Sequence, residues 1–158
     1  MIETLSATSP LVLVGCGKMG GAMLTGWLER GLVPDGVVVV EKMPSDDLRA
    51  AAAARGFALH AEAPSGLAAR VLLVAVKPQG LAATLPTLTG FVGPDTVVVS
   101  IVAGKTIAGF ASALSTDRIV RAMPNTPAQV GCGITGAACG AAVTESDRAL
   151  VAALLAAI

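Results

Sequence analysis

The sequence predicts an α/β fold in which a doubly wound, mostly parallel β-sheet carries helices on both faces. Short, continuously apolar runs, typical of strands buried on both faces, recur along the chain. Segments with the length and periodicity of helices separate these runs, which is the pattern of parallel strands joined by helical crossovers. Glycine-rich and polar residues follow several of the strands, at the edge where such sheets bind ligands.

The strands are expected where apolar and β-branched residues follow one another. They span residues 11–14, 37–40, 57–60, 71–76, 96–102 and 118–123, and residues 131–139 form a further extended segment. The run at residues 71–76 is the most hydrophobic, so we expect it near the centre of the sheet.

We expect helices between residues that favour the N-terminus of a helix and residues that favour its C-terminus. The first spans residues 18–30 and ends before Gly31. Pro78 suits the first position of the helix after the fourth strand, and residues 63–69 form a turn or a short helix. Hydroxyl side chains that can cap a helix open three others, at Ser45, Thr106 and Thr144. Asp147 completes a capping-box pattern in the last of these.

The composition indicates one folded domain. The 158 residues are 54% hydrophobic and 14% charged, which excludes a disordered chain. Eleven basic and eleven acidic residues give zero net charge, so no electrostatic footprint for nucleic acid is present. Residues 1–4 do not begin a signal peptide, and the apolar run at 149–158 is half a membrane span. We therefore expect a flexible N-terminus over residues 1–10, one domain over residues 11–158, a cytoplasmic location and no membrane partner.

The cysteines and the histidine indicate neither a disulfide framework nor a metal site. Cys16, Cys132 and Cys139 are odd in number and form no CxxC pair. His60 is the one histidine, and its place at the end of a predicted strand favours a surface position. The sequence thus identifies no metal ligand and no catalytic residue.

A GxGxxG motif follows the first strand and opens the first helix, as in Rossmann-like dinucleotide-binding folds. It reads Gly15-Cys16-Gly17-Lys18-Met19-Gly20. Gly15 permits a tight turn, Gly17 lets the backbone approach a pyrophosphate, and Gly20 lets the helix pack on the strand. The N–H groups at the helix start attract phosphates. The alternative is an ordinary glycine-rich turn.

Four side chains near the expected cofactor each have two interpretations. Cys16 is a small residue beside the phosphates or a reactive thiol, and we favour the first. Lys18 contacts phosphate or faces solvent. Glu41 stands where an acidic residue accepts the adenosine ribose hydroxyls of NAD, whereas Lys42 and nearby Ser45 suit the 2′-phosphate of NADP. The alternative for Glu41 and Lys42 is a pair of solvated side chains at the end of the strand. The choice between NAD and NADP stays open, with a slight preference for NAD.

Three later segments also follow strands and face the same edge. Residues 75–78 place Lys77 and Pro78 near the expected nicotinamide ribose, and residues 100–104 are small enough for close approach of a flat ring. Residues 123–127 form a loop with two prolines, in which Asn125 is able to donate to a ligand. A purely structural turn is the alternative for this loop.

Together these segments resemble the N-terminal domain of pyrroline-5-carboxylate reductase. The matching segments are Leu13-Val14-Gly15-Cys16-Gly17-Lys18-Met19-Gly20, Ala75-Val76-Lys77-Pro78-Gln79, Ser100-Ile101-Val102-Ala103-Gly104 and Val120-Arg121-Ala122-Met123-Pro124-Asn125-Thr126-Pro127. Their order and spacing fit from about residue 11 to the end of the chain. The first motif is common to many oxidoreductases, whereas the second and fourth are more specific.

The resemblance implies the last step of proline synthesis, in which NADPH or NADH reduces the C=N bond of the small molecule 1-pyrroline-5-carboxylate. It implies that residues 15–20 hold the pyrophosphate. The nicotinamide would be lined by Ala75, Val76, Lys77, Pro78, Ile101, Val102 and Ala103. Met123 and Asn125 would border the imine. The chain has no tyrosine and no evident general acid, which fits a protonated imine because such a substrate accepts hydride without one.

The sequence departs from this family in three respects. Glu62 and Ala63 stand where the family often has an asparagine against the adenosine, and Glu41 disagrees with the NADP preference often associated with the family. The third is length, because the resemblance implies a further helical domain that makes the family's homo-oligomers and binds the substrate carboxylate, and we expect that these 158 residues do not include it. We therefore expect a cofactor-binding domain that is inactive alone. A stand-alone nucleotide-binding module, or a reductase of another imine or carbonyl, are the alternatives.

Overall fold

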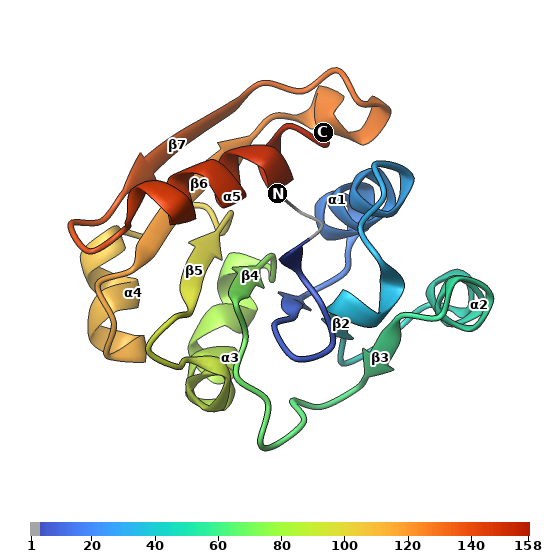
Figure 1. The fold of residues 1–158 in the computed structure, drawn as a ribbon, viewed down its shortest axis with the longest axis horizontal. Coiled ribbons are helices and arrows are strands. Elements are labelled where there is room, and N and C mark those ends of the chain that lie inside the picture. The colour runs from blue at the N-terminus through green and yellow to red at the C-terminus, as the bar shows by residue number, and fades with distance from the viewer. Residues whose placement is uncertain (1–3) are drawn as a thin grey trace.

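The computed structural model describes residues 4–158, and within this range the strands form one seven-stranded sheet (Figure 1). The strands are β1 (Leu11–Val14), β2 (Val37–Val40), β3 (Ala58–His60), β4 (Val71–Val74), β5 (Val97–Ser100), β6 (Ile119–Pro124) and β7 (Thr135–Cys139). Their order is β3-β2-β1-β4-β5-β6-β7, and all neighbours are parallel except β6 and β7. The chain changes direction across the sheet between β1 and β4, which is the switch point where open α/β sheets bind ligands.

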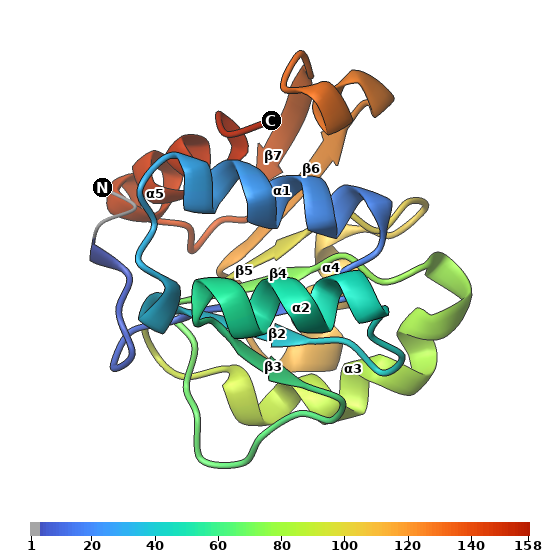
Figure 2. The same ribbon diagram turned by 90° about the vertical axis from the view of Figure 1, so that its right-hand side faces the viewer.

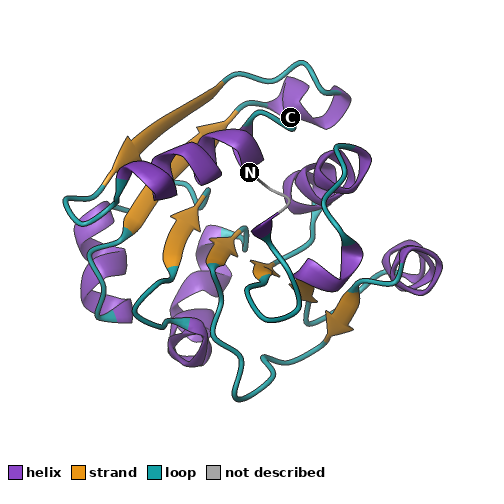
Figure 3. Cartoon of the chain, in the orientation of Figure 1, coloured by secondary structure: helices purple, strands orange, loops and turns teal. Residues whose placement is uncertain are grey.

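Helices cover both faces of the sheet, as the sequence predicts (Figures 2 and 3). The α-helices are α1 (Lys18–Glu29), α2 (Asp46–Arg55), α3 (Leu81–Leu88), α4 (Ile107–Leu114) and α5 (Glu145–Leu155). Short 3₁₀ turns are η2 (Pro34–Gly36), η3 (Pro78–Gly80), η4 (Thr89–Phe91) and η5 (Thr126–Val130). One buried apolar cluster joins the sheet to α1, α2 and α5, and another joins it to α3 and α4. No helix among residues 4–158 is both long and apolar enough to cross a membrane.

Three helices begin at the hydroxyl residues that the sequence indicates. The Ser45 hydroxyl accepts from the Leu48 N–H at 3.2 Å, and the Thr106 hydroxyl accepts from the Gly109 N–H at 3.1 Å. In α5, Thr144 and Asp147 exchange hydrogen bonds in a capping box. These bonds satisfy N–H groups that have no partner within the helix.

Helix α5 is attached to the sheet and to α1 by buried polar contacts. The Asp147 carboxylate is fully buried and pairs with Arg118 at 2.8 Å and Arg70 at 2.9 Å, which precede β6 and β4. The indole Nε1 of Trp27 in α1 donates to the Leu154 carbonyl oxygen in α5 at 2.9 Å. Both contacts join segments that are far apart in the sequence.

The structure differs from several predicted boundaries. Residues 1–3 lie outside the described range, but Leu5, which falls in the segment expected to be flexible, is fully buried. The strands at 71–76 and 96–102 end earlier, at Val74 and Ser100, because the chain turns away at the edge of the sheet. Of the two alternatives for residues 63–69, the structure has the turn, at residues 65–66, and no helix, since Gly66 has a φ of +74° that a right-handed helix does not accept.

Candidate cofactor site at the carboxyl edge of the sheet

The glycine turn between β1 and α1 is closely packed at its two ends and open in the middle. Gly15 has a φ of +88°, and a Cβ there would lie 2.9 Å from backbone atoms of Ala75 and Val76. A Cβ on Gly20 would lie 2.4 Å from the Gly15 carbonyl oxygen, so α1 packs directly on the turn. No atom lies within 4 Å of the Cβ position of Gly17. The turn therefore requires glycine at both ends and leaves space above its centre.

The first turn of α1 has no acceptor from a side chain. Its N-cap is Gly17, which forms no side-chain cap, and the first turn contains no acidic residue. The exposed Lys18 begins the helix, and the half-buried Met19 packs against the core. An N-terminus of this kind combines free N–H groups with the positive end of the helix dipole, which suits a phosphate.

Glu41, just after β2, contacts the glycine turn directly. Its Oε2 accepts from the Cys16 N–H at 2.8 Å, and its Oε1 accepts from the Met43 N–H at 3.2 Å. Burial, and secondarily the charge of Glu41, raise the pKa of the Cys16 thiol to about 11. Cys16 therefore stays a neutral thiol at physiological pH, which disfavours the reactive-thiol interpretation. Lys42, the next residue, is exposed.

The residues after β4 and β5 come together beside the switch point. Ala75 is half-buried against the glycine turn, and its N–H donates to the Val14 carbonyl oxygen at 2.7 Å. Of the other residues in these two segments, Val76 and Ile101 are half-buried, while Lys77, Pro78 and Ala103 are exposed. Val102 is only 2% exposed and packs in the cluster with α3 and α4. The prediction that residue 102 lines the nicotinamide therefore concerns its backbone, because its side chain lies in the core.

Arg121 in β6 holds the turn after β5, a role that the sequence reasoning missed. Its guanidinium donates to the Ser100 carbonyl oxygen and Oγ, both at 2.7 Å, and to the Val102 carbonyl oxygen. It also lies over the Phe110 ring, 5.9 Å from the centroid, and burial lowers the pKa of Arg121. The signal in the sequence was an arginine inside an otherwise apolar strand, since a half-buried charge requires polar partners.

The loop after β6 borders the same edge. Met123 is 50% exposed, and Asn125 is exposed with its Oδ1 accepting from the Ile134 N–H at 2.9 Å. Asn125 thereby ties together the two sides of the β6–β7 connection. A groove of ≈ 580 Å³ runs between α1 and the η5 turn and includes Lys18, Thr25 and Gln129.

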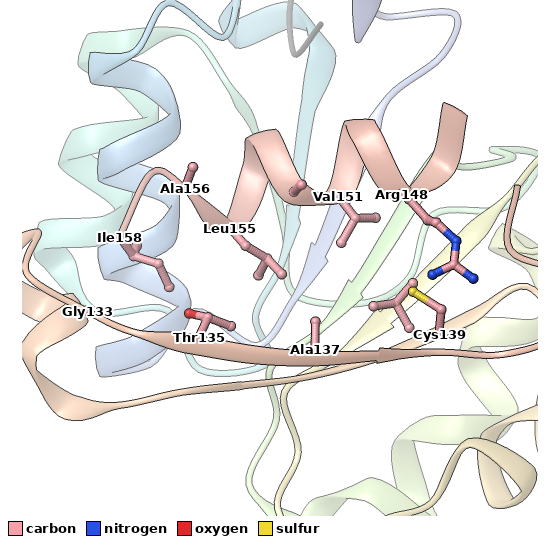
Figure 4. A pocket seen from close by; sticks show the side chains of 11 residues that line it. Gly133, Thr135, Ala137, Cys139, Arg148, Val151, Leu155, Ala156 and Ile158 are labelled. Atoms are coloured by element: carbon pink, nitrogen blue, oxygen red, sulfur yellow. The ribbon is translucent and has the colours of Figure 1, made fainter. Parts of the chain in front are cut away.

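A second groove, of ≈ 510 Å³, lies away from the glycine turn, between α5 and the β6–β7 pair (Figure 4). Figure 4 shows Val151 and Leu155 directed from α5 toward the strand that carries Ala137, with Arg148 beside Cys139 at one end. Across residues 4–158, no three His, Cys, Asp or Glu residues come together as a metal site. His60 is exposed at the end of β3.

Known proteins with similar sequences are oxidoreductases. A family model described as "NADP oxidoreductase coenzyme F420-dependent" matches residues 10–104. Pyrroline-5-carboxylate reductase of Escherichia coli is 41% identical over 140 residues, which cover 86% of this chain and 51% of that protein. The Mycobacterium tuberculosis enzyme of the same name is 36% identical over 155 residues, 94% of this chain and 52% of that one. The chain thus spans about half the length of these curated relatives.

Solved structures show the same fold. A pyrroline-5-carboxylate reductase from Coxiella burnetii superposes with a TM-score of 0.87 at 27% identity, covering 96% of this chain and 57% of that one. The Plasmodium falciparum pyrroline carboxylate reductase, solved with NADP bound, superposes with a TM-score of 0.76 at 19% identity, covering 96% and 56%. The family model for NADP oxidoreductases matches more than half of the residues of this chain, and the chain therefore belongs to that family.

Proposed function

We propose that the chain is the cofactor-binding part of a pyrroline-5-carboxylate reductase that uses NADPH or NADH. The observation that carries this proposal is the glycine turn at the switch point, where α1 begins without a side-chain cap and the space above Gly17 is open. The names of the matched relatives in Escherichia coli and Mycobacterium tuberculosis support the choice of reaction.

The residues present suit a dinucleotide laid across this edge. The open space at Gly17 and the uncapped N–H groups of α1 fit a pyrophosphate. Glu41 and Lys42 lie on the adenosine side, after β2, and the backbone of residues 75–78 and 101–103 lies on the nicotinamide side. Met123 and Asn125 border the substrate. The bound nicotinamide supplies the hydride, and the protein binds it and orients it toward the C=N carbon.

The proposal also covers where the substrate is bound. The matched relatives are about twice as long as the chain. We assign contacts to the substrate carboxylate, and assembly into a homo-oligomer, to the part of those relatives that the chain does not span. A protonated imine accepts hydride without a strong protein acid, so the described edge needs only to position the two reactants.

Thermal unfolding in the presence of cofactor tests the proposal. We expect NADH or NADPH to raise the melting temperature of the 158-residue chain, because a ligand that binds the folded state at 100 times its Kd stabilises by about 2.7 kcal/mol. Ribose 5-phosphate at the same concentration and ionic strength is the control and should give no shift. Absence of a shift with both dinucleotides at millimolar concentration would refute the proposal. Consumption of NADH or NADPH with 1-pyrroline-5-carboxylate by the complete protein tests the substrate.

A further inference from the structure

The Glu41 carboxylate is fixed by backbone donors on two segments. One oxygen accepts from Cys16 in the glycine turn at 2.8 Å, and the other accepts from Met43 beyond β2 at 3.2 Å. Cys16 and Glu41 are 25 residues apart in the chain. The carboxylate therefore bridges the two loops that meet at the adenosine side of the switch point.

The carboxylate keeps acceptor capacity for a ligand. An ionised carboxylate offers about four acceptor positions, of which these two bonds occupy half. In this fold, an acidic residue after the second strand accepts the ribose hydroxyls of the adenosine. The two backbone bonds hold Glu41 at the place where the 2′-hydroxyl of NADH would be a donor to it.

The charge of Glu41 has no cationic partner. Among residues 4–158, the ion pairs join Arg70 and Arg118 to aspartates and none includes Glu41. Burial chiefly, with the Glu41 charge as a second cause, raises the pKa of the Cys16 thiol, so the negative field of this carboxylate extends into the glycine turn. A phosphate on the 2′-oxygen would lie in the same field.

The groups that suit a 2′-phosphate are poorly placed to offset this repulsion. Lys42 is exposed, and among residues 4–158 no ion pair joins it to Glu41. The hydroxyl of Ser45 accepts from the Leu48 N–H as the cap of α2, and the acidic Asp46 and Asp47 follow it in the first turn. The adenosine side therefore presents more negative than positive side chains.

We infer that Glu41 makes the site selective for NADH over NADPH. This inference rests on the proposed function, and it decides between the two cofactors that the sequence leaves open. The carboxylate attracts the neutral ribose hydroxyls and repels the additional phosphate, whose charge lies next to it without compensation.

Calorimetric titration of the 158-residue chain with NADH and NADPH at low ionic strength tests the selectivity. We expect NADH to bind at least about tenfold more tightly than NADPH. In Glu41→Gln, which keeps the size of the side chain and removes its charge, the ratio of the two Kd values should fall toward one. Asp35→Asn removes a negative charge from an exposed position before β2, at the opposite edge of the sheet, and should leave that ratio unchanged. Glu41→Asp keeps the charge and should retain a preference for NADH.

The outcomes separate this inference from the proposed function. If the wild-type chain binds neither dinucleotide, both fail. If it binds both equally, or prefers NADPH, the selectivity inference fails while the proposed function stands. Lys42→Gln gives an independent measurement, because a large loss of NADPH affinity in that variant would show that Lys42 binds the 2′-phosphate and would overturn the inference even if Glu41→Gln does not fold.

Discussion

Gly20 and Gly21 are neighbours in the first turns of α1 but have different surroundings. A Cβ on Gly20 would lie 2.4 Å from the Gly15 carbonyl oxygen, whereas no atom lies within 4 Å of a Cβ on Gly21. The first glycine is therefore required by close packing of the helix on the turn. The second has no such requirement, and it lowers helix stability because glycine has more freedom in the unfolded chain.

Gly20→Ala and Gly21→Ala form a matched pair that tests this difference. We expect Gly20→Ala to lower the free energy of unfolding by about 1–3 kcal/mol, the usual cost of overpacking, and to weaken NADH binding by at least about tenfold. Gly21→Ala should raise the free energy of unfolding by about 0.5–1 kcal/mol and leave the affinity unchanged. Urea unfolding and calorimetry provide the two measurements, and equal effects of the two substitutions would contradict the packing argument.

Asp147 connects three elements, because it caps α5 and pairs with the arginines that precede β4 and β6. Burial alone would raise the pKa of this carboxyl. Hydrogen bonds from Arg118, Thr144 and Arg70 outweigh burial and lower the pKa of Asp147 to about 2, from an ordinary value of 3.8. A carboxyl whose pKa is lower in the folded state stabilises the fold above its unfolded pKa, and that stabilisation is lost as pH falls through the folded one.

The pH dependence of unfolding tests the contribution of Asp147. We expect Asp147→Asn to lower the free energy of unfolding by at least about 2 kcal/mol at pH 7. The difference between wild type and this variant should shrink by about 2 kcal/mol as the pH falls from about 4 to about 2. Asp35→Asn, at an exposed position before β2, serves as the control and should show little of this change. A difference that is constant across the acid range would rule out the low pKa.

The elements that sequence reasoning predicts well are those with local signals. The caps at Ser45, Thr106 and Thr144 depend on residues within one turn, and the glycine turn depends on six consecutive residues. An arginine inside an apolar strand indicates that Arg121 needs polar partners, but the sequence does not say which ones, so its bonds to the turn after β5 were not predicted. The burial of the Val102 side chain was not predicted either, because its orientation depends on where β5 ends, at Ser100.

For the site, the sequence predicts the positions of residues better than their hydrogen-bond partners. The position of Glu41 after a strand is visible in the sequence, but its hydrogen bond to Cys16 depends on the neighbouring places of β1 and β2 in the sheet. The structure also shows that the Asn125 Oδ1 accepts from the Ile134 N–H, a partner that neither interpretation of this loop named. Tertiary partners of polar side chains are thus the information that a single sequence lacks.

The lysines of the whole molecule lie at one edge of the sheet. All lysines of the sequence are exposed and follow β1, β2, β4 or β5 at the carboxyl edge: Lys18, Lys42, Lys77 and Lys105. Aspartates precede β2, β5 and β6 at the opposite edge: Asp35, Asp95 and Asp117. Although the net charge is zero, Lys77 and Lys105 place positive potential at the part of this edge beyond β4 and β5, whereas Glu41, Asp46 and Asp47 make the part beyond β2 negative.

Association kinetics test the effect of the positive charge beyond β4 and β5. We expect NADH to associate more slowly as ionic strength rises from about 0.01 M to about 0.1 M, because the Debye length falls from about 30 to about 10 Å. Lys105→Gln should slow association at low ionic strength and weaken the dependence on salt. Asp35→Asn, at the opposite edge, should change neither. Stopped-flow measurement of NADH fluorescence gives both rates, and a salt-independent rate would contradict electrostatic steering.

Trp27 gives this molecule a built-in optical reporter. It is the one tryptophan of a chain without tyrosine, so the ultraviolet emission of the folded protein comes from a single indole. That indole is fully buried and hydrogen-bonded to α5, and it belongs to the helix whose first turn faces the expected phosphates. Dihydronicotinamide absorbs where tryptophan emits, so energy transfer would signal an occupied site. A red shift of the emission, by contrast, would signal separation of α5 from α1.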